Sequence, residues 1–471
     1  MRILVAIANH GTKNQPYLTT LLEAYRAMTH HVDIVVLSDR PKDLGPDVEV
    51  RVGAPTRDPR SLPFAHRRLF TDRVADYDLF IYSEDDTLIT QQHVDAFIEI
   101  GRLLPEDEVL GFQRYEIGPD GRRYYSSIHS AYRWEPTTIE RIAGETFADH
   151  TNLHAACYMV TQAQLRLAIA SGGFDVAPHR GPFWSLMVSA ASDIYRQCGL
   201  RRRLCVSRID DFLVHHLPNV YIGKLGVDEA EYRTQLEAIE QIADKTLSDV
   251  ELLVPTARLA TSIWNVPQHP LPPPSQILLD LPSGSAERVL SIGVTAGAVE
   301  VALFPTAKAI VGVPVDHITS AVASTRGLHL LEPRLDDIES STPEGGFDAI
   351  LFNQTLHFLS DPVGLLQRLR AVASPDCEVL VAMPNTPHHR LRHVTRRAFA
   401  GPVPRRGFDV DGIHAPGTDF LRMVGAKSGI DWTISLSRAR GVERLGIGRR
   451  LPSMTDRWTA REVYAVGRYR H

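Results

Sequence analysis

The stretch FDAILFNQTLHFLSDPVGLLQRLRAVASPDCEVLVAMPN, residues 347–385, decides the fold class of this chain. It opens with an apolar run (347–354), continues with apolar residues at helical spacing (361–373), and closes with a second apolar run (377–385). Short apolar runs are typical of buried parallel strands, and strands that alternate with helices form a parallel sheet. The stretch therefore predicts an α/β fold.

Elements of the same kind precede this stretch. RVLSIG (288–293) and AIVGVPV (309–315) are predicted strands, and the turn VTAG leads from the first strand into a short helix, AVEVALF. Glycines at a strand-to-helix turn let the backbone approach a ligand closely. The G-x-G-x-x-G spacing of dinucleotide-binding proteins is absent here, so the turn is not their fingerprint.

The first third of the chain also alternates strands with helices. Strands are predicted at 2–9, 32–39 and 78–83, and helices at 17–28 and 64–77. In parallel α/β sheets, ligands bind at the carboxyl ends of the strands. Asn9, Asp39 and the acids at 84–86 follow such ends, so we expect these side chains to converge on one crevice.

A proline-rich stretch separates the two α/β patterns. Residues 226–252 are amphipathic and predict a helix, and VPQHPLPPPSQ (266–276) can continue neither a helix nor a central strand. We therefore predict a first domain over 1–225, a helix and linker over 226–285, and a second domain over 286–471.

Composition narrows the class of protein. The 471 residues are 44% hydrophobic and 23% charged, with a formal net charge of -5, which is ordinary for a globular protein and disfavours nucleic acid as a partner. Four scattered cysteines fit neither a disulfide framework nor a zinc site, and they favour a reducing compartment. No secretory signal or apolar run of membrane-spanning length is present, so we expect a soluble, cytoplasmic protein.

Three consecutive acids end the third predicted strand. Because side chains alternate along an extended backbone, Glu84 and Asp86 would point to one side and Asp85 to the other. Two carboxylates on one side repel each other unless a cation or hydrogen-bond donors lie between them, and Mg²⁺ and Mn²⁺ prefer carboxylate oxygens. The acids predict a metal platform; the alternative is a solvated acidic turn.

In this setting YDLFIYSEDDTLIT (77–90) resembles the metal-binding stretch of GT-A glycosyltransferases, and the resemblance covers about residues 1–225. It implies that Glu84, Asp85 and Asp86 hold Mn²⁺ or Mg²⁺ against the diphosphate of a nucleotide-sugar donor, with Asp86 as the first candidate for direct ligation. It also implies a late histidine ligand, for which His215 and His216 are candidates. The alternative for either histidine is a purely structural role.

The same resemblance assigns further roles. Asn9 and Asp39 match positions that contact the base or ribose, although Asp39 also fits a simple turn. One of Arg67 and Arg68 would neutralise the diphosphate, the alternative being a surface charge pair. Asp210 and Asp211 are the candidate catalytic residues, because one of them would supply a carboxylate near the acceptor. The alternative is that they cap a helix.

The second domain resembles Rossmann-like, S-adenosylmethionine-dependent methyltransferases. The resemblance rests on VLSIGVTAG (289–297) and on the strand–helix–strand stretch 347–385. It implies that S-adenosylmethionine is held by Gly293 and Gly297 of the turn, with further contacts from Asp316 and from Asp337 or its neighbour Asp336, the alternative for the last two being a solvated turn. Three departures weaken this cofactor assignment: the family's usual acid, glycine and second acid are replaced by Ser291, Thr295 and Pro314.

Together the two resemblances predict an α/β protein with a GT-A-like domain and a Rossmann-like methyltransferase domain. The leading hypothesis is a metal-dependent hexosyltransferase of polysaccharide biosynthesis that moves a sugar from a nucleotide-sugar to a glycan or glycolipid acceptor. The alternatives are an S-adenosylmethionine-dependent methyltransferase whose first domain recognises the acceptor, and a non-enzymatic nucleotide-binding scaffold. The basic stretch 388–406 also leaves peripheral contact with the inner face of a membrane open.

Overall fold

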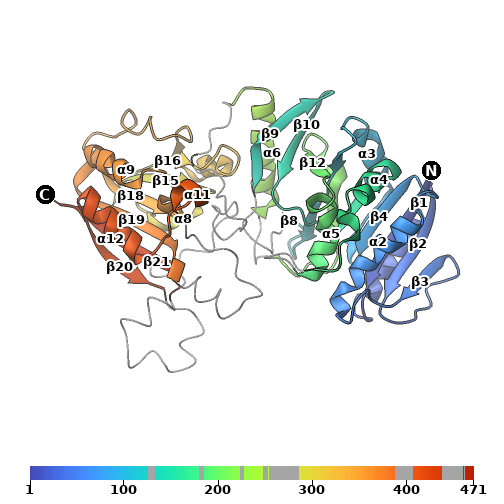
Figure 1. The fold of residues 1–471 in the computed structure, drawn as a ribbon. Coiled ribbons are helices and arrows are strands. Elements are labelled where there is room, and N and C mark those ends of the chain that lie inside the picture. Colours follow the sequence, from blue (N-terminus) through green and yellow to red (C-terminus); the bar gives the residue numbers. More distant parts are fainter. Residues whose placement is uncertain are drawn as a thin grey trace. The chain divides into compact units, whose positions relative to one another are not determined.

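The structure is a computed structural model of the whole chain. It describes residues 1–125, 133–179, 185–222, 227–247, 253, 286–387, 407–437, 460 and 462–470. The chain divides into two compact units, Met1–Ser248 and Asp249–His471, here called the first and second unit (Figure 1). The proline-rich stretch 266–276 and the basic stretch 388–406 lie outside the described residues.

The first unit is built on a five-stranded sheet with the order β11-β4-β1-β2-β3 (Figure 1). Its strands are β1 (Arg2–Asn9), β2 (His31–Ser38), β3 (Val48–Val52), β4 (Leu79–Glu84) and β11 (Cys157–Thr161). The pairs β1–β2, β1–β4 and β2–β3 are parallel, whereas β11 runs antiparallel to β4. The predicted parallel α/β arrangement is therefore confirmed for the first three predicted strands.

Helices position this sheet through apolar faces. They are α1 (Gln15–Arg26), α2 (Ala65–Asp72), α3 (Gln91–Gly101), α4 (Gln162–Ala170), α5 (Leu186–Arg196) and α6 (Glu229–Ala243). Helix α1 starts with a proline in its first turn, where a missing N–H costs nothing, and buries Leu18, Leu21 and Leu22 in the core. The predicted linker begins with α6, whose Tyr232 stacks on Tyr125 within the first unit.

Two smaller sheets complete the first unit, with the orders β6-β12-β10-β9 and β14-β8-β7-β13-β5. Their strands are β5 (Thr87–Leu88), β6 (Glu108–Leu110), β7 (Gln113–Ile117), β8 (Arg123–Tyr125), β9 (Trp134–Ile142), β10 (Glu145–His150), β12 (Arg201–Cys205), β13 (Leu213–His216) and β14 (Val227–Asp228). Strand β13 pairs with β5, which places His216 opposite Thr87, the residue that follows the three acids.

The second unit contains one seven-stranded sheet with the order β17-β16-β15-β18-β19-β21-β20 (Figure 1). Its strands are β15 (Arg288–Val294), β16 (Ala309–Pro314), β17 (His329–Leu330), β18 (Phe347–Asn353), β19 (Ala373–Pro384), β20 (Ile430–Leu436) and β21 (Glu462–Tyr469). The first five strands are parallel and follow the Rossmann order. Strand β21 is antiparallel to both of its neighbours.

The helices of the second unit are short. They are α8 (Ala298–Leu303), α9 (Pro362–Leu369), α11 (Phe408–Asp411) and α12 (Thr418–Ser428). Helix α9 begins at Pro362 because the side chain of Asp361 caps the N–H of Gly364, and its buried leucines join the core beneath β18 and β19. None of the described helices is long and apolar enough to cross a membrane.

Candidate functional site

The turn between β15 and α8 lies at the carboxyl edge of the second unit's sheet. Gly293 and Gly297 both adopt left-handed backbone conformations, with φ of 87° and 77°. A Cβ on Gly293 would lie 1.9 Å from Cγ2 of Thr355, and one on Gly297 would lie 3.0 Å from Cβ of Ala323. Glycine is therefore required at Gly293 by a neighbouring loop as well as by its backbone.

The side chain of Ser291 finds its hydrogen-bond partner within the protein. Ser291 Oγ donates to Glu300 Oε1 at 2.9 Å, and both side chains are buried. Burial raises the pKa of the Glu300 carboxyl, while the hydrogen bond from Ser291 acts to lower it. The Ser291–Glu300 pair thus joins β15 to α8.

Asp316 is the carboxylate nearest to the end of β16, two residues beyond Pro314. It is buried and accepts hydrogen bonds from the backbone N–H of Thr319 at 2.6 Å and from Thr319 Oγ1 at 2.8 Å. These two hydrogen bonds fix the turn that follows β16. By contrast, Asp337 lies in an irregular segment, where it pairs with Arg334 at 3.0 Å.

The loop after β18 brings polar side chains to the same edge. Asn353 ends the strand and is 8% exposed, and Thr355 Oγ1 donates to the carbonyl of Ile292 at 2.7 Å. His357 is buried, and its Nδ1 has no hydrogen-bond partner among the residues that the structure describes. Burial, together with the charge of His414, lowers the pKa of His357 to about 3, so its imidazole is neutral at physiological pH.

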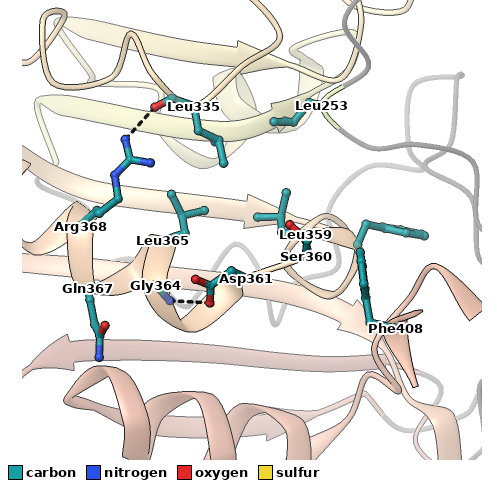
Figure 2. Close-up of a pocket in the computed structure, with 11 residues that line it drawn as sticks. Leu253, Leu335, Leu359, Ser360, Asp361, Gly364, Leu365, Gln367, Arg368 and Phe408 are labelled. Atoms are coloured by element: carbon teal, nitrogen blue, oxygen red, sulfur yellow. Dashed lines mark hydrogen bonds between the residues drawn. The ribbon is translucent and has the colours of Figure 1, made fainter. Parts of the chain in front are cut away.

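A cavity of about 780 Å³ opens beside α9 (Figure 2). Its lining is mostly apolar, from Leu253, Leu335, Phe358, Leu359, Leu365 and Phe408, with Ser360, Asp361, Gly364, Gln367 and Arg368 completing it. Figure 2 shows Arg368 reaching across from α9 to the carbonyl of Leu335, a 3.4 Å hydrogen bond. The volume lies within the range of small-molecule sites, so the methyltransferase-like unit offers room for a ligand near the carboxyl end of β18.

Two of the three acids of the first unit, Asp85 and Asp86, accept hydrogen bonds from asparagine side chains. Asp85 is buried and accepts from Asn9 Nδ2 at 2.5 Å and from Asn14 Nδ2 at 2.7 Å. Burial raises its pKa to about 6, although the two amides act to lower it. Asp86 accepts from Asn14 at 3.3 Å and lies 3.5 Å from His216 Nε2.

Glu84 and His216 complete this cluster. Burial and the nearby charge of Asp86 raise the pKa of Glu84 to about 8, so its carboxyl is largely protonated near neutral pH. His216 Nδ1 lies 2.5 Å from Glu116 Oε1. Burial acts to lower the pKa of His216, but its hydrogen bonds with Asp86 and Glu116 outweigh that effect and raise it.

The predicted metal site finds no support in the described part of the chain, which contains no group of three or more His, Cys, Asp or Glu side chains able to hold a metal ion. Asn9 and Asn14 occupy both oxygens of Asp85, while Asn14 and His216 contact Oδ2 of Asp86. The other candidate ligand, His215, instead bonds Asn219 at 3.0 Å and stacks on Tyr115.

Asn9 contacts the acids, whereas Asp39 forms hydrogen bonds elsewhere, with the loop after β1 and with Arg40. Asp39 accepts from the N–H of Gly11 at 2.7 Å and from Arg40 at 2.8 Å. The hydrogen bond from Arg40 holds the pKa of Asp39 at about 2. It therefore organises the loop after β1, while Asn9 is the strand-end residue that reaches the acids.

The predicted diphosphate-binding arginines do not face the crevice as free cations. Arg67 is buried and pairs with Asp193 at 2.8 Å, with its guanidinium 4.3 Å from the centre of the Phe64 ring. Arg68 is exposed and pairs with Asp72 on the same helix. A guanidinium paired with a buried carboxylate is less available to a phosphate, so this geometry does not favour the role predicted for Arg67, which stays a prediction.

Asp210 and Asp211 lie in the 3-10 helix Ile209–Phe212 and line a different pocket from the one that holds the three acids. Asp210 pairs with Arg233, and Asp211 pairs with Arg208 at 2.7 Å. The pairing with Arg233 lowers the pKa of Asp210. The structure therefore separates the predicted catalytic carboxylates from the predicted donor site.

Sequence reasoning missed two polar residues of the first unit's crevice. Asn14 bonds both Asp85 and Asp86, and its place just beyond the first strand could have indicated it. Arg114 lies in β7, where the local sequence QRYEI carries no signal for a site.

Comparison with known proteins gives one family match. Residues 275–425 match the family model described as methionine biosynthesis protein MetW, well short of half of the chain. No curated protein sequence matches. The match spans most of the sheet with the Rossmann order, from β15 to β19.

Several of the similar solved structures are described as methyltransferases. An S-adenosylmethionine-dependent methyltransferase from Mesorhizobium loti is 14% identical, covers 41% of this chain and 96% of its own, and gives a TM-score of 0.32. A possible histamine N-methyltransferase from Thermotoga maritima is 16% identical, covers 41% of this chain and 86% of its own, and gives a TM-score of 0.30. At sequence identities and TM-scores this low, these structures support no conclusion about individual residues of this chain.

The second unit therefore fits the fold of S-adenosylmethionine-dependent methyltransferases, through its strand order and its MetW match. The predicted glycosyltransferase function is overturned, because the family match found for this chain is to MetW, over residues 275–425. These comparisons give no support for a GT-A domain over the first unit. The structure does show a mixed α/β sheet there.

Proposed function

We propose that this protein is an S-adenosylmethionine-dependent methyltransferase whose second unit binds the cofactor at the carboxyl edge of its sheet. The observation that carries the proposal is the MetW match over 275–425, which falls on strands in the Rossmann order. The first unit would recognise the methyl acceptor. The four cysteines are buried and unpaired, in keeping with a reducing compartment such as the cytoplasm.

The residues at this edge fit the cofactor by the chemistry of their donors and acceptors. Asp316 places a buried carboxylate just beyond the end of β16, and a charged acceptor suits ribose hydroxyls; Asn353 offers both a donor and an acceptor. The backbone N–H groups of the turn from Gly293 to Gly297 would meet the carboxylate of the methionine part. Bound there, S-adenosylmethionine supplies an activated methyl group.

The protein's own contribution to such a reaction is to bind, orient and exclude water. Asp316 would orient the nucleoside, because a charged acceptor makes the stronger hydrogen bonds. His357 stays neutral, since burial lowers its pKa to about 3, so it would act as a neutral hydrogen-bonding group at Nδ1. The apolar cavity beside α9 would keep a neighbouring ligand out of water.

Calorimetry with S-adenosylmethionine and S-adenosylhomocysteine tests this proposal. Asp316→Asn keeps an oxygen for the Thr319 cap but removes the charge, and we expect it to weaken binding by about 10- to 100-fold. The matched control is Asp376→Asn, because Asp376 is exposed in the same unit, and its affinity should equal that of the unmodified chain.

Absence of binding to the unmodified, folded protein would overturn the proposed function. Equal weakening by both variants would indicate a general charge effect and remove the role assigned to Asp316.

A further inference from the structure

The first unit contains a cavity of about 340 Å³ that the proposed methyl transfer does not use. It opens at the carboxyl ends of β1 and β4. The residues that line it are Ala8, His10, Asn14, Pro59, Arg60, Leu62, Pro63, Glu84, Asp85, Asp86, Met187, His216 and Tyr221. This cavity is here called the acidic crevice.

An unpaired cation lies beside the acidic crevice. Arg114 is 6% exposed, and its guanidinium lies 5.7 Å from the centre of the ring of Tyr221, a lining residue. Within the described residues Arg114 has neither a hydrogen bond nor an ion pair, and its buried Nε has no partner. A buried guanidinium without a partner is costly, so its place against the crevice wall indicates that a ligand supplies the missing acceptor.

Unpaired acceptors lie in the same crevice. Among the described residues, Glu84 Oε1 and Asp86 Oδ1 are buried oxygens of the crevice lining that have no hydrogen-bond partner. Each such oxygen has lost its water without gaining a donor. The crevice therefore needs both a hydrogen-bond acceptor, for Arg114, and several hydrogen-bond donors.

The chemistry of these groups selects the kind of ligand. A simple anion would satisfy Arg114 but face three acids, and a simple cation would satisfy the acids but leave Arg114 unpaired. Hydroxyl groups both donate and accept, so a ring bearing several hydroxyls satisfies both sets without adding charge. The flat faces of such a ring would meet Tyr221, Leu62 and Met187, which also line the crevice.

We infer that the acidic crevice binds a polyhydroxylated ring, a sugar unit of the acceptor, through Arg114, Glu84 and Asp86. That this sugar belongs to the methyl acceptor rests on the proposed function. The binding itself does not, because the crevice lies wholly within the first unit.

Saturation-transfer NMR with three methyl glycosides, those of β-glucose, α-mannose and β-galactose at millimolar concentration, tests the inference on the full chain. At least one glycoside should show transfer to its ring protons. Arg114→Met should weaken that binding by tenfold or more. The matched control is Arg122→Met, because Arg122 is 73% exposed and lies in the same unit.

Thermal unfolding of each variant shows whether it is folded. If Arg114→Met does not fold, Asp86→Asn takes its place, since an asparagine keeps an oxygen for Asn14. β-Alanine serves as a zwitterionic competitor. Binding of β-alanine without any glycoside would overturn the inference, and so would the absence of glycoside binding or equal binding by both arginine variants.

The outcome is separable from that of the proposed function. Glycoside binding without S-adenosylmethionine binding would support the crevice and refute the methyltransferase. S-adenosylmethionine binding without glycoside binding would support the methyltransferase and refute the inference about the crevice.

Discussion

The buried pair of Arg67 and Asp193 gives a sharp prediction about the stability of the first unit. The two side chains are 7% and 3% exposed, and their charged atoms lie 2.8 Å apart. Arg67 also donates to the carbonyl of Val176 at 3.2 Å. Arg67→Met keeps much of the side-chain volume but leaves Asp193 as a buried carboxylate without its partner.

Breaking a buried ion pair on one side costs about 3–5 kcal/mol. His179 Nε2 lies 3.6 Å from Asp193 Oδ2 and stays beside it in the variant, so Asp193 keeps one polar neighbour. We therefore expect the free energy of unfolding of the first unit to fall by about 3–4 kcal/mol. Arg68→Met is the control, because Arg68 is 84% exposed and its pair within α2 is worth about 0.3–0.5 kcal/mol.

The assay must report each unit separately, since a chain of two units need not unfold in one step. Thiol labelling in urea, followed by peptide mass spectrometry, does so. Cys157 and Cys198 are buried in the first unit, and Cys377 is buried in the second. Arg67→Met should expose the first two thiols at lower urea and leave Cys377 unchanged.

A loss below about 1 kcal/mol, the value of a surface pair, would refute the reasoning. The double variant Arg67→Met/Asp193→Leu should recover most of the stability, because it removes the stranded charge as well. If the double variant is as unstable as the single one, lost packing rather than the stranded charge is the cause.

Two further predictions use the same labelling and urea unfolding. Gly293→Ala should destabilise the second unit by about 3 kcal/mol, because the alanine would be strained in the left-handed region and would displace Thr355. The control is Gly327→Ala, which has a φ of 89° but no atom within 4 Å of the added Cβ, and it should cost about 1 kcal/mol. Equal losses of stability in the two variants would contradict the steric argument. The pKa of Glu84 rises to about 8 on folding, mainly through burial, and that of His216 also rises. Stability of the first unit should therefore fall as pH rises from about 5 to about 8, and Glu84→Gln should flatten the urea midpoint over that range; a midpoint that rises with pH would contradict this assignment.

The candidate sites were only partly predictable. A strand-end asparagine and three acids indicated the acidic crevice, and Asn9 does bond Asp85. The metal and its histidine ligand did not follow, because Asn14 supplies the donors that a cation would otherwise replace. Arg114 escaped notice, since nothing in β7 distinguishes a buried unpaired arginine from a paired one.

The sequence by itself determined the alternation of strands and helices in both units, because hydrophobic periodicity is a local property that neighbouring residues carry. Only the tertiary structure decided that Arg67 meets Asp193, 126 residues away, and that Thr355 fills the space beside Gly293. It also decided that β21, near the end of the chain, inserts between β19 and β20. These pairings depend on contacts between distant segments, and a carboxylate or guanidinium has the same local sequence whether a ligand, an amide or an opposite charge satisfies it.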